Sequence, residues 1–159
     1  MKILSAFILS ILCFHLHACK TDNIIEQQNN SNTISTTDKK TMNITVGTHI
    51  FTATLYNNAT AMAFQKLLPL TIDMSELNGN EKYFDLSDNL PAKASNQGSI
   101  QAGDLMLYGT NTLVLFYKSF TTSYKYTPVG RIDEPALLAA ALGSGNIIVK
   151  FESIHTKIK

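Results

Sequence analysis

The hydrophobic and polar residues divide the chain into three zones. Ile3 to Phe14 is an apolar run, and Lys20 to Thr41 is dominated by Asn, Gln, Ser and Thr. From Met42 onward, short runs alternate apolar and polar positions. Alternation with a period of two, bounded by turn residues, is typical of strands with one buried face. We therefore expect one mainly β domain over residues 42–152 and a short tail over residues 153–159.

The alternating runs predict about eight strands and two helices, in the order ββα, five strands, α, β. The strand candidates are residues 42–46, 51–55, 70–74, 82–86, 105–108, 112–117, 124–132 and 147–151. Pro128 and Gly130 are expected to break the strand over residues 124–132, and residues 87–98 are expected to be loop.

Each helix candidate has its own start and stop signals. Asn58 is the predicted N-cap of a helix over residues 59–68, which Pro69 ends. Asp133 is the predicted N-cap of a helix over residues 134–142, which Gly143 ends. Both helices are expected to be short.

The N-terminus carries the most specific targeting signal. The apolar run has the length of a signal peptide and is too short to cross a bilayer as a mature helix. Leu16-His17-Ala18-Cys19 resembles the lipobox of bacterial lipoprotein signals, although His17 replaces the usual small residue. We expect residues 1–18 to be a lipoprotein signal peptide and Cys19 to be lipidated. The alternative is an ordinary signal peptide cut near Ala18, which leaves Cys19 as an unpaired thiol.

The polar zone is expected to be a tether. Residues 19–41 hold few apolar side chains and cannot bury enough surface to offset the entropy of ordering them. A lipid on Cys19 would therefore hold the folded domain close to the non-cytoplasmic face of a bacterial envelope membrane.

Charge and cysteine content exclude several classes of function. The formal net charge is +1 and no dense Lys/Arg cluster occurs, so nucleic acid is not an expected partner. The two cysteines, Cys13 and Cys19, both lie at the N-terminus, which rules out a disulfide framework or a thiolate metal site in the domain. We expect a monomeric domain that needs neither a metal nor a cofactor.

Four phrases of the domain resemble the bacterial cyclophilin-like family of small domains. They are Leu-Pro-Leu-Thr-Ile-Asp-Met (68–74), Leu-Asn-Gly-Asn-Glu-Lys-Tyr (77–83), Gly-Asp-Leu-Met-Leu-Tyr-Gly (103–109) and Tyr-Thr-Pro-Val-Gly-Arg-Ile (126–132). The similarity spans nearly all of residues 42–152. It implies a closed eight-stranded barrel with a helix over each open end and a ligand groove on its side.

The phrases of a catalytic cyclophilin are missing. The resemblance implies an arginine within a Phe-x-Arg phrase on the strand after the first helix, followed by Gln-Gly-Gly. The matching strand reads Leu70-Thr71-Ile72-Asp73-Met74, and the only arginine in the chain is Arg131. We therefore expect no catalytic residues and little prolyl isomerase activity, because that reaction needs a guanidinium fixed beside the amide.

Four residues are the candidate ligand-binding positions. The resemblance places Phe116 on a groove-lining strand and Tyr124 and Tyr126 near the groove's rim. Arg131 can hold a carboxylate or phosphate. The structural alternatives are core packing for the three aromatics and an ion pair for Arg131 with Asp133, Glu134 or another local acid.

The favoured function is an envelope-tethered binding module for an extended peptide or small ligand. The first alternative is a divergent enzyme, a prolyl isomerase or another activity, in the same groove. The second is a lipoprotein that only docks to another envelope protein, which an exposed apolar patch away from the groove would favour.

Overall fold

The computed structural model describes residues 40–154. The predicted signal peptide, Cys19 and all but the last two residues of the predicted tether lie outside the described residues, as does most of the C-terminal tail. The first strand already begins at Thr41. No helix of the described part is long and apolar enough to span a membrane.

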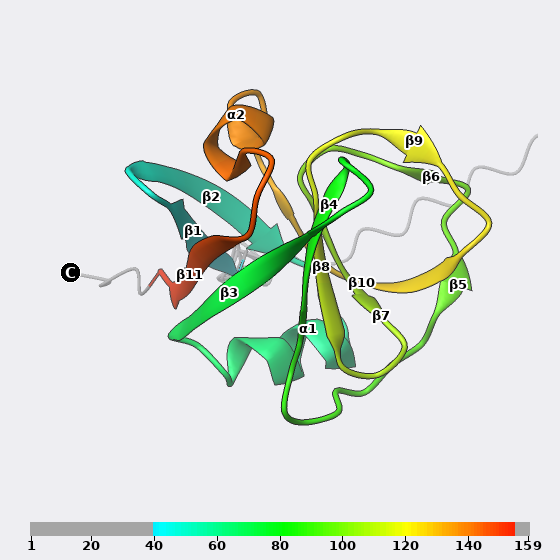
Figure 1. Cartoon of the computed structure of the whole chain (residues 1–159). Coiled ribbons are helices and arrows are strands. Elements are labelled where there is room, and N and C mark those ends of the chain that lie inside the picture. Colours follow the sequence, from blue (N-terminus) through cyan, green and yellow to red (C-terminus); the bar gives the residue numbers. More distant parts are fainter. Residues whose placement is uncertain (1–39, 155–159) are drawn as a thin grey trace, which may run out of the picture. The chain divides into compact units, whose positions relative to one another are not determined.

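The described residues form eleven strands and two short helices (Figure 1). In chain order these are β1 (Thr41–Val46), β2 (His49–Leu55), α1 (Ala59–Gln65), β3 (Leu70–Leu77), β4 (Glu81–Asp85), β5 (Ser95–Asn96), β6 (Ser99–Ile100), β7 (Asp104–Tyr108), β8 (Thr112–Phe116), β9 (Phe120–Thr121), β10 (Lys125–Ile132), α2 (Leu138–Leu142) and β11 (Ile147–Ser153).

Eight of the strands close into an antiparallel barrel, as the sequence predicted. The hydrogen-bonded order is β2-β1-β11-β3-β4-β8-β7-β10, and β10 pairs with β2 to complete the ring. The three additional strands are two residues long: β5 pairs with β10 at the sheet edge, while β6 and β9 form a separate pair. The expected count of eight strands was therefore correct for the barrel and too low for the described residues.

The expected break at Pro128 and Gly130 is a β-bulge inside one continuous strand. β10 runs unbroken, and its register against β7 shifts between these two residues. Gly130 also lies opposite Leu55 at the seam between β10 and β2. A Cβ on Gly130 would stand 2.7 Å from the carbonyl oxygen of Thr54, so only glycine permits this close approach of the two strands. The residue expected to interrupt the sheet instead closes it.

The helix α1 starts where the sequence predicts and ends earlier. The side-chain oxygen of Asn58 accepts a hydrogen bond from the amide of Ala61 at 2.8 Å, which confirms the N-cap. The helix ends at Gln65 instead of Leu68. Its buried Phe64 packs edge-on against Phe151 of β11, with ring centroids 5.7 Å apart, and so closes one end of the barrel.

The second helix is shorter than predicted, and its predicted cap was wrong. α2 begins at Leu138, its N-cap residue is Leu137, and no side chain caps it. Asp133 instead extends the seam of the barrel: its amide donates to the carbonyl of Thr52 at 2.9 Å, and its carboxylate accepts from the Thr54 hydroxyl at 2.7 Å. These contacts hold the chain extended beyond β10, so the helix starts one turn later.

The strands β7 and β8 bury side chains on both faces. Their inward side chains, Leu105, Leu107, Leu113 and Leu115, belong to the core inside the barrel. Their outward side chains, Met106, Val114 and Phe116, join Ile100 and Tyr126 in a second buried cluster outside it. The chain from β5 to β6 and around β9 lies on this side of the barrel (Figure 1). The outer cluster is the base on which the candidate site stands.

Candidate functional site

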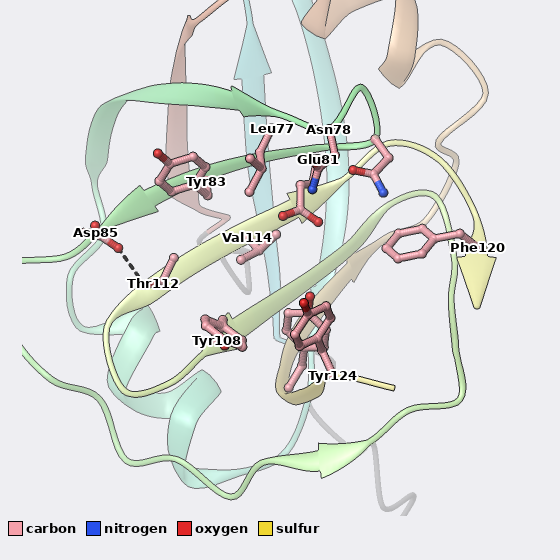
Figure 2. A pocket seen from close by; sticks show the side chains of 12 residues that line it. Leu77, Asn78, Glu81, Tyr83, Asp85, Tyr108, Thr112, Val114, Phe120 and Tyr124 are labelled. Carbon is pink, nitrogen blue, oxygen red and sulfur yellow. Dashed lines mark hydrogen bonds between the residues drawn. The ribbon is translucent and has the colours of Figure 1, made fainter. Parts of the chain in front are cut away.

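A pocket of about 410 Å³ lies against the outer face of the barrel (Figure 2). Its floor is formed by Glu81, Tyr83 and Asp85 of β4 and by Thr112 and Val114 of β8. The antiparallel register places these side chains on one face, since Tyr83 pairs with Val114 and Asp85 pairs with Thr112. Residues two apart on a strand point to the same side, so the alternation of β4 sets the floor.

One wall of the pocket is aromatic. It consists of Tyr108 at the end of β7, Phe120 of β9, Tyr124 and Tyr126. The ring of Tyr108 contacts Tyr124 and Tyr126, with centroids 6.2 Å and 5.6 Å away. Buried Phe116 supports the wall from below, because its ring lies 5.6 Å from Phe120 and 5.4 Å from Tyr126. The rings form a continuous, packed surface of the kind that holds a flat or apolar ligand.

The opposite wall is the connection between β3 and β4. Leu77, Asn78 and Asn80 line it. Asn78 has a φ of 57°, the left-handed conformation that asparagine tolerates in tight turns, and with Gly79 it turns the chain between the two strands. The side-chain oxygen of Asn80 is buried and has no hydrogen-bond partner within the described part of the chain.

The carboxyl group of Glu81 is the distinctive polar feature of the pocket. Glu81 is only 8% exposed, and Figure 2 shows its carboxylate directed into the space between the two walls. Within residues 40–154 it accepts no hydrogen bond and forms no ion pair. Burial raises the pKa of Glu81, and the negative charge of Glu76 raises it further. The chain therefore keeps a carboxyl group with a strengthened affinity for a proton in the pocket.

The hydroxyl of Tyr126, which lines the same pocket, remains a neutral donor. Burial raises the pKa of Tyr126 to about 12, and the charge of Glu81 is the next cause. Tyr126 is 6% exposed and lines the same pocket. A phenol of this pKa stays protonated at neutral pH, so the pocket combines a hydrogen-bond donor with a carboxyl acceptor.

A second buried charge lies next to Glu81 in sequence and on the other face of β4. The ammonium of Lys82 is fully buried and donates to the carboxylate of Glu76 and to the carbonyls of Gly143 at 3.0 Å and Gly145 at 2.6 Å. It also lies 5.5 Å from the centre of the Tyr117 ring. Because its three hydrogens are all used inside the barrel, Lys82 is not available to the pocket.

The structure brings together three of the four residues singled out from the sequence. Tyr124 and Tyr126 line the pocket, and Phe116 is completely buried beneath it. Arg131 does not line it: its Nε atom lies 3.8 Å from the carboxylate of Asp104, and its side chain is half-exposed. The ion-pair alternative for Arg131 is therefore realised with Asp104, an acid on the neighbouring strand β7.

The sequence reasoning missed Glu81, Tyr83, Tyr108 and Phe120. A signal for the first two was present, because placing Lys82 and Phe84 inward forces Glu81 and Tyr83 outward onto one face. Nothing local indicates that this outward face is covered, since the covering residues lie 25 to 45 positions further along the chain. That long-range contact requires the three-dimensional fold.

A larger hollow beside α2 has no comparable polar group. It measures about 610 Å³ and is lined by residues including Ile50, Asp133 and Leu137. Asp133 is engaged by Thr54, and Ile50 and Leu137 are more than half exposed. Within residues 40–154, no three His, Cys, Asp or Glu side chains lie close enough together to hold a metal ion. The aromatic pocket is therefore the candidate site.

Comparison with known proteins agrees with the architecture. A family model described as the cyclophilin-like family matches residues 44–152. Among solved structures, McbB in complex with tryptophan matches with a TM-score of 0.58 and 15% sequence identity, over 74% of this chain and 46% of McbB. The chain thus spans about half the length of that protein, and the likeness concerns the fold. No curated protein shows significant sequence similarity to the chain.

Proposed function

This chain belongs to the cyclophilin-like family, and we propose that it is an envelope-tethered binding module whose pocket on the side of the barrel takes a small ligand or an extended peptide. The observation that carries the proposal is the pocket itself. It combines packed aromatic rings with a buried carboxyl group that no side chain of residues 40–154 engages. Convergent polar groups in an apolar hollow are typical of ligand sites.

The energetic cost of Glu81 supports a binding role. Burying a carboxylate without a partner destabilises a fold, so its presence in the pocket has to be offset by another interaction. McbB, a protein of similar fold, has been solved in complex with tryptophan, so a chain of this architecture can accompany a small aromatic molecule. Both observations favour a ligand over a purely structural role for the outer cluster.

Ligand binding is tested by an NMR screen of small molecules and proline-containing peptides against the full-length protein. A compound that occupies the pocket shifts the amide signals of β4, β8 and β10 together. Tyr124→Ala is expected to weaken the binding of such a compound about fivefold, because it removes one stacking ring, worth roughly 1 kcal/mol. Tyr124 is 63% exposed, so this change should leave the fold intact.

Tyr56→Ala is the matched control, because Tyr56 is also an exposed tyrosine, at 41%, but does not line the pocket. Affinity should stay within twofold of the wild type in this variant. Equal losses in both variants, or compounds that shift only signals far from the pocket, would show that the site lies elsewhere.

The envelope tether rests on Cys19 and is tested separately. We expect Cys19→Ala to release the protein from the membrane fraction or to leave it unprocessed, because attachment of the lipid requires that thiolate. Immunoblots of fractionated cells, with globomycin-sensitive processing as a second readout, report the outcome. A Cys19→Ala protein that is processed and remains with membranes like the wild type would disprove the lipoprotein assignment.

A second candidate function is an enzyme in the same pocket. The raised pKa of Glu81, together with the protonated hydroxyl of Tyr126, favours it, because a carboxyl group of this kind can accept and return a proton. Mass spectrometry of bound compounds after prolonged incubation tests this alternative. Conversion that Glu81→Gln abolishes, while binding persists, would replace the binding module with an enzyme.

A further inference from the structure

Two side-chain acceptors that are adjacent in the chain have no partner within the described residues, and one of them, the carboxylate of Glu81, faces the pocket. Glu81 presents its carboxylate, and Asn80 has a buried side-chain oxygen with no partner in residues 40–154. An acceptor that has lost water recovers that cost only from a donor. A ligand that covers the carboxylate of Glu81 must therefore donate hydrogen bonds to it.

The charges of the side chains that line the pocket indicate which kind of hydrogen-bond donor the ligand should carry. Among the described residues, the side chains that line the pocket include two carboxyl groups, Glu81 and Asp85, and none is basic. Asp85 already accepts a hydrogen bond from the Thr112 hydroxyl at 2.6 Å, and it is exposed. Glu81 is buried and unengaged, so it is the group that needs a compensating charge. A neutral N–H satisfies one lone pair, whereas a cation also offsets the cost of burying the ionised carboxylate.

The aromatic wall also favours a positively charged ligand. Tyr108, Tyr124 and Tyr126 pack at right or oblique angles, so different ring faces and edges border the space around Glu81. Tyr83 adds a ring from the floor. Ring faces carry negative potential and attract ammonium groups, most strongly where water is excluded. The carboxylate of Glu81 and the tyrosine rings therefore both favour a cationic ligand.

We infer that the pocket recognises an organic cation: a small molecule with an aromatic or apolar body and an ammonium group that pairs with Glu81. The inference rests on the proposed binding function and names the class of ligand. The body packs against the rings of the aromatic wall, and the ammonium donates to the carboxylate. A pocket of about 410 Å³ holds a molecule of the size of a biogenic amine.

The test uses three indole compounds that differ only in the head group. Tryptamine is cationic at neutral pH, tryptophol is neutral and indole-3-acetate is anionic. Calorimetric titration of the full-length protein gives the three affinities. We expect tryptamine to bind at least tenfold more tightly than tryptophol and indole-3-acetate to bind most weakly.

Glu81→Gln distinguishes the contribution of the negative charge to binding from that of the side chain's shape. It keeps the size of the side chain and should reduce tryptamine affinity at least tenfold, while tryptophol changes less than twofold. Glu152→Gln is the control, because Glu152 is a half-exposed acid of β11 that pairs with Lys150 at 2.8 Å outside the pocket. Its affinities should match those of the wild type. Loss of tryptamine selectivity in both variants would indicate a general field effect and overturn the inference.

The outcomes distinguish the two proposals. If all three indoles bind equally, or the acid binds best, the pocket is a ligand site but the assignment of a cation is wrong. If none binds at millimolar concentration, an organic cation of this size is excluded, and the NMR screen with Tyr124→Ala and Tyr56→Ala still decides whether the pocket binds anything. Only selective, Glu81-dependent binding of tryptamine supports the inference.

Discussion

Glu81 and Lys82 are neighbours on one strand, and both carry charge into buried surroundings on opposite faces of the barrel wall. Inside, Lys82 donates to one carboxylate and two carbonyls. Outside, Glu81 has no partner within residues 40–154. A fully satisfied buried charge holds elements together, whereas an unsatisfied one weakens the fold. The two faces of β4 therefore separate a satisfied charge from an unsatisfied one, and the proposed binding function assigns the unsatisfied charge to a ligand.

The inner network explains how one end of the barrel is fixed. Glu76 of β3 accepts from Lys82, from the hydroxyl of Tyr117 at 2.8 Å and from the amide of Gly79 at 2.9 Å. Through the carbonyls of Gly143 and Gly145, the same ammonium binds the loop that joins α2 to β11. The network joins three segments that are far apart in sequence, and removing any member leaves buried groups unpaired.

The largest effect is expected from breaking this inner network. Lys82→Met keeps most of the side chain's volume but removes the charge, leaving Glu76 and two carbonyls without their donor. We expect a loss of about 3 kcal/mol in the free energy of unfolding, as for other buried pairs that lose one partner. Urea unfolding of the full-length protein, followed by circular dichroism, measures it. Lys150→Met, at a half-exposed lysine of β11, should change stability by less than about 0.5 kcal/mol. Similar losses of stability in Lys82→Met and Lys150→Met would show that the inner network does not hold the barrel together.

The next largest effect is on the pH dependence of stability, to which Glu76 and Glu81 contribute in opposite directions. Burial tends to raise the pKa of Glu76, but the hydrogen bonds from Lys82, Tyr117 and Gly79 outweigh it and lower the pKa below its usual 4.5. Its contribution to stability is present above pH 4.5 and is lost as the pH falls through the lowered value. The pKa of Glu81 is raised, so its folded form binds a proton more tightly than its unfolded form. The contribution of Glu81 to stability is therefore fully present below pH 4.5 and is lost as the pH rises through its raised pKa.

Two variants resolve these opposite slopes. Glu81→Gln should stabilise the protein at pH 7 by about 1 kcal/mol and flatten the decline above pH 4.5, because it removes a charge that has no partner. Glu76→Gln should destabilise the protein at pH 7 and remove most of the loss on the acid side. Unfolding free energies measured from pH 3 to pH 8 test both. A Glu81→Gln protein that is less stable than the wild type at pH 7 would mean that the carboxylate is structural.

The barrel could be predicted from the sequence because its strands carry local signals. Alternation along β1 and β2, the Asn78-Gly79 turn and the start of α1 are each encoded within a few residues. The three two-residue strands are too short to show a period. The beginning of α2 depends on Asp133, whose partners, Thr52 and Thr54, lie about 80 positions earlier.

The candidate site was predictable only where the family resemblance supplied the geometry. Tyr124 and Tyr126 were identified in this way, as aromatics near a groove. Glu81 was missed because a charged residue on a strand indicates a solvent-facing position, and its burial depends on the aromatic wall, whose residues lie far along the chain. Arg131 drew attention as the only guanidinium, yet its partner Asp104 is set by the register between β7 and β10.

The smallest effect is expected from replacing Arg131. This replacement tests whether the protein catalyses prolyl isomerisation as catalytic cyclophilins do. Prolyl isomerisation crosses a barrier of ~18 to 20 kcal/mol, and lowering it requires a cationic donor held against the twisting amide. None of the described residues that line the pocket is basic, and Arg131 is engaged with Asp104 outside it. We therefore expect cis/trans exchange of X-Pro model peptides to keep its uncatalysed time of tens to hundreds of seconds, measured by NMR exchange spectroscopy. Arg131→Ala should alter neither that rate nor tryptamine affinity by more than twofold. Acceleration that survives repurification and disappears in Arg131→Ala would make this arginine a catalytic residue, and the division between the two faces of β4 would then no longer describe the chemistry of the protein.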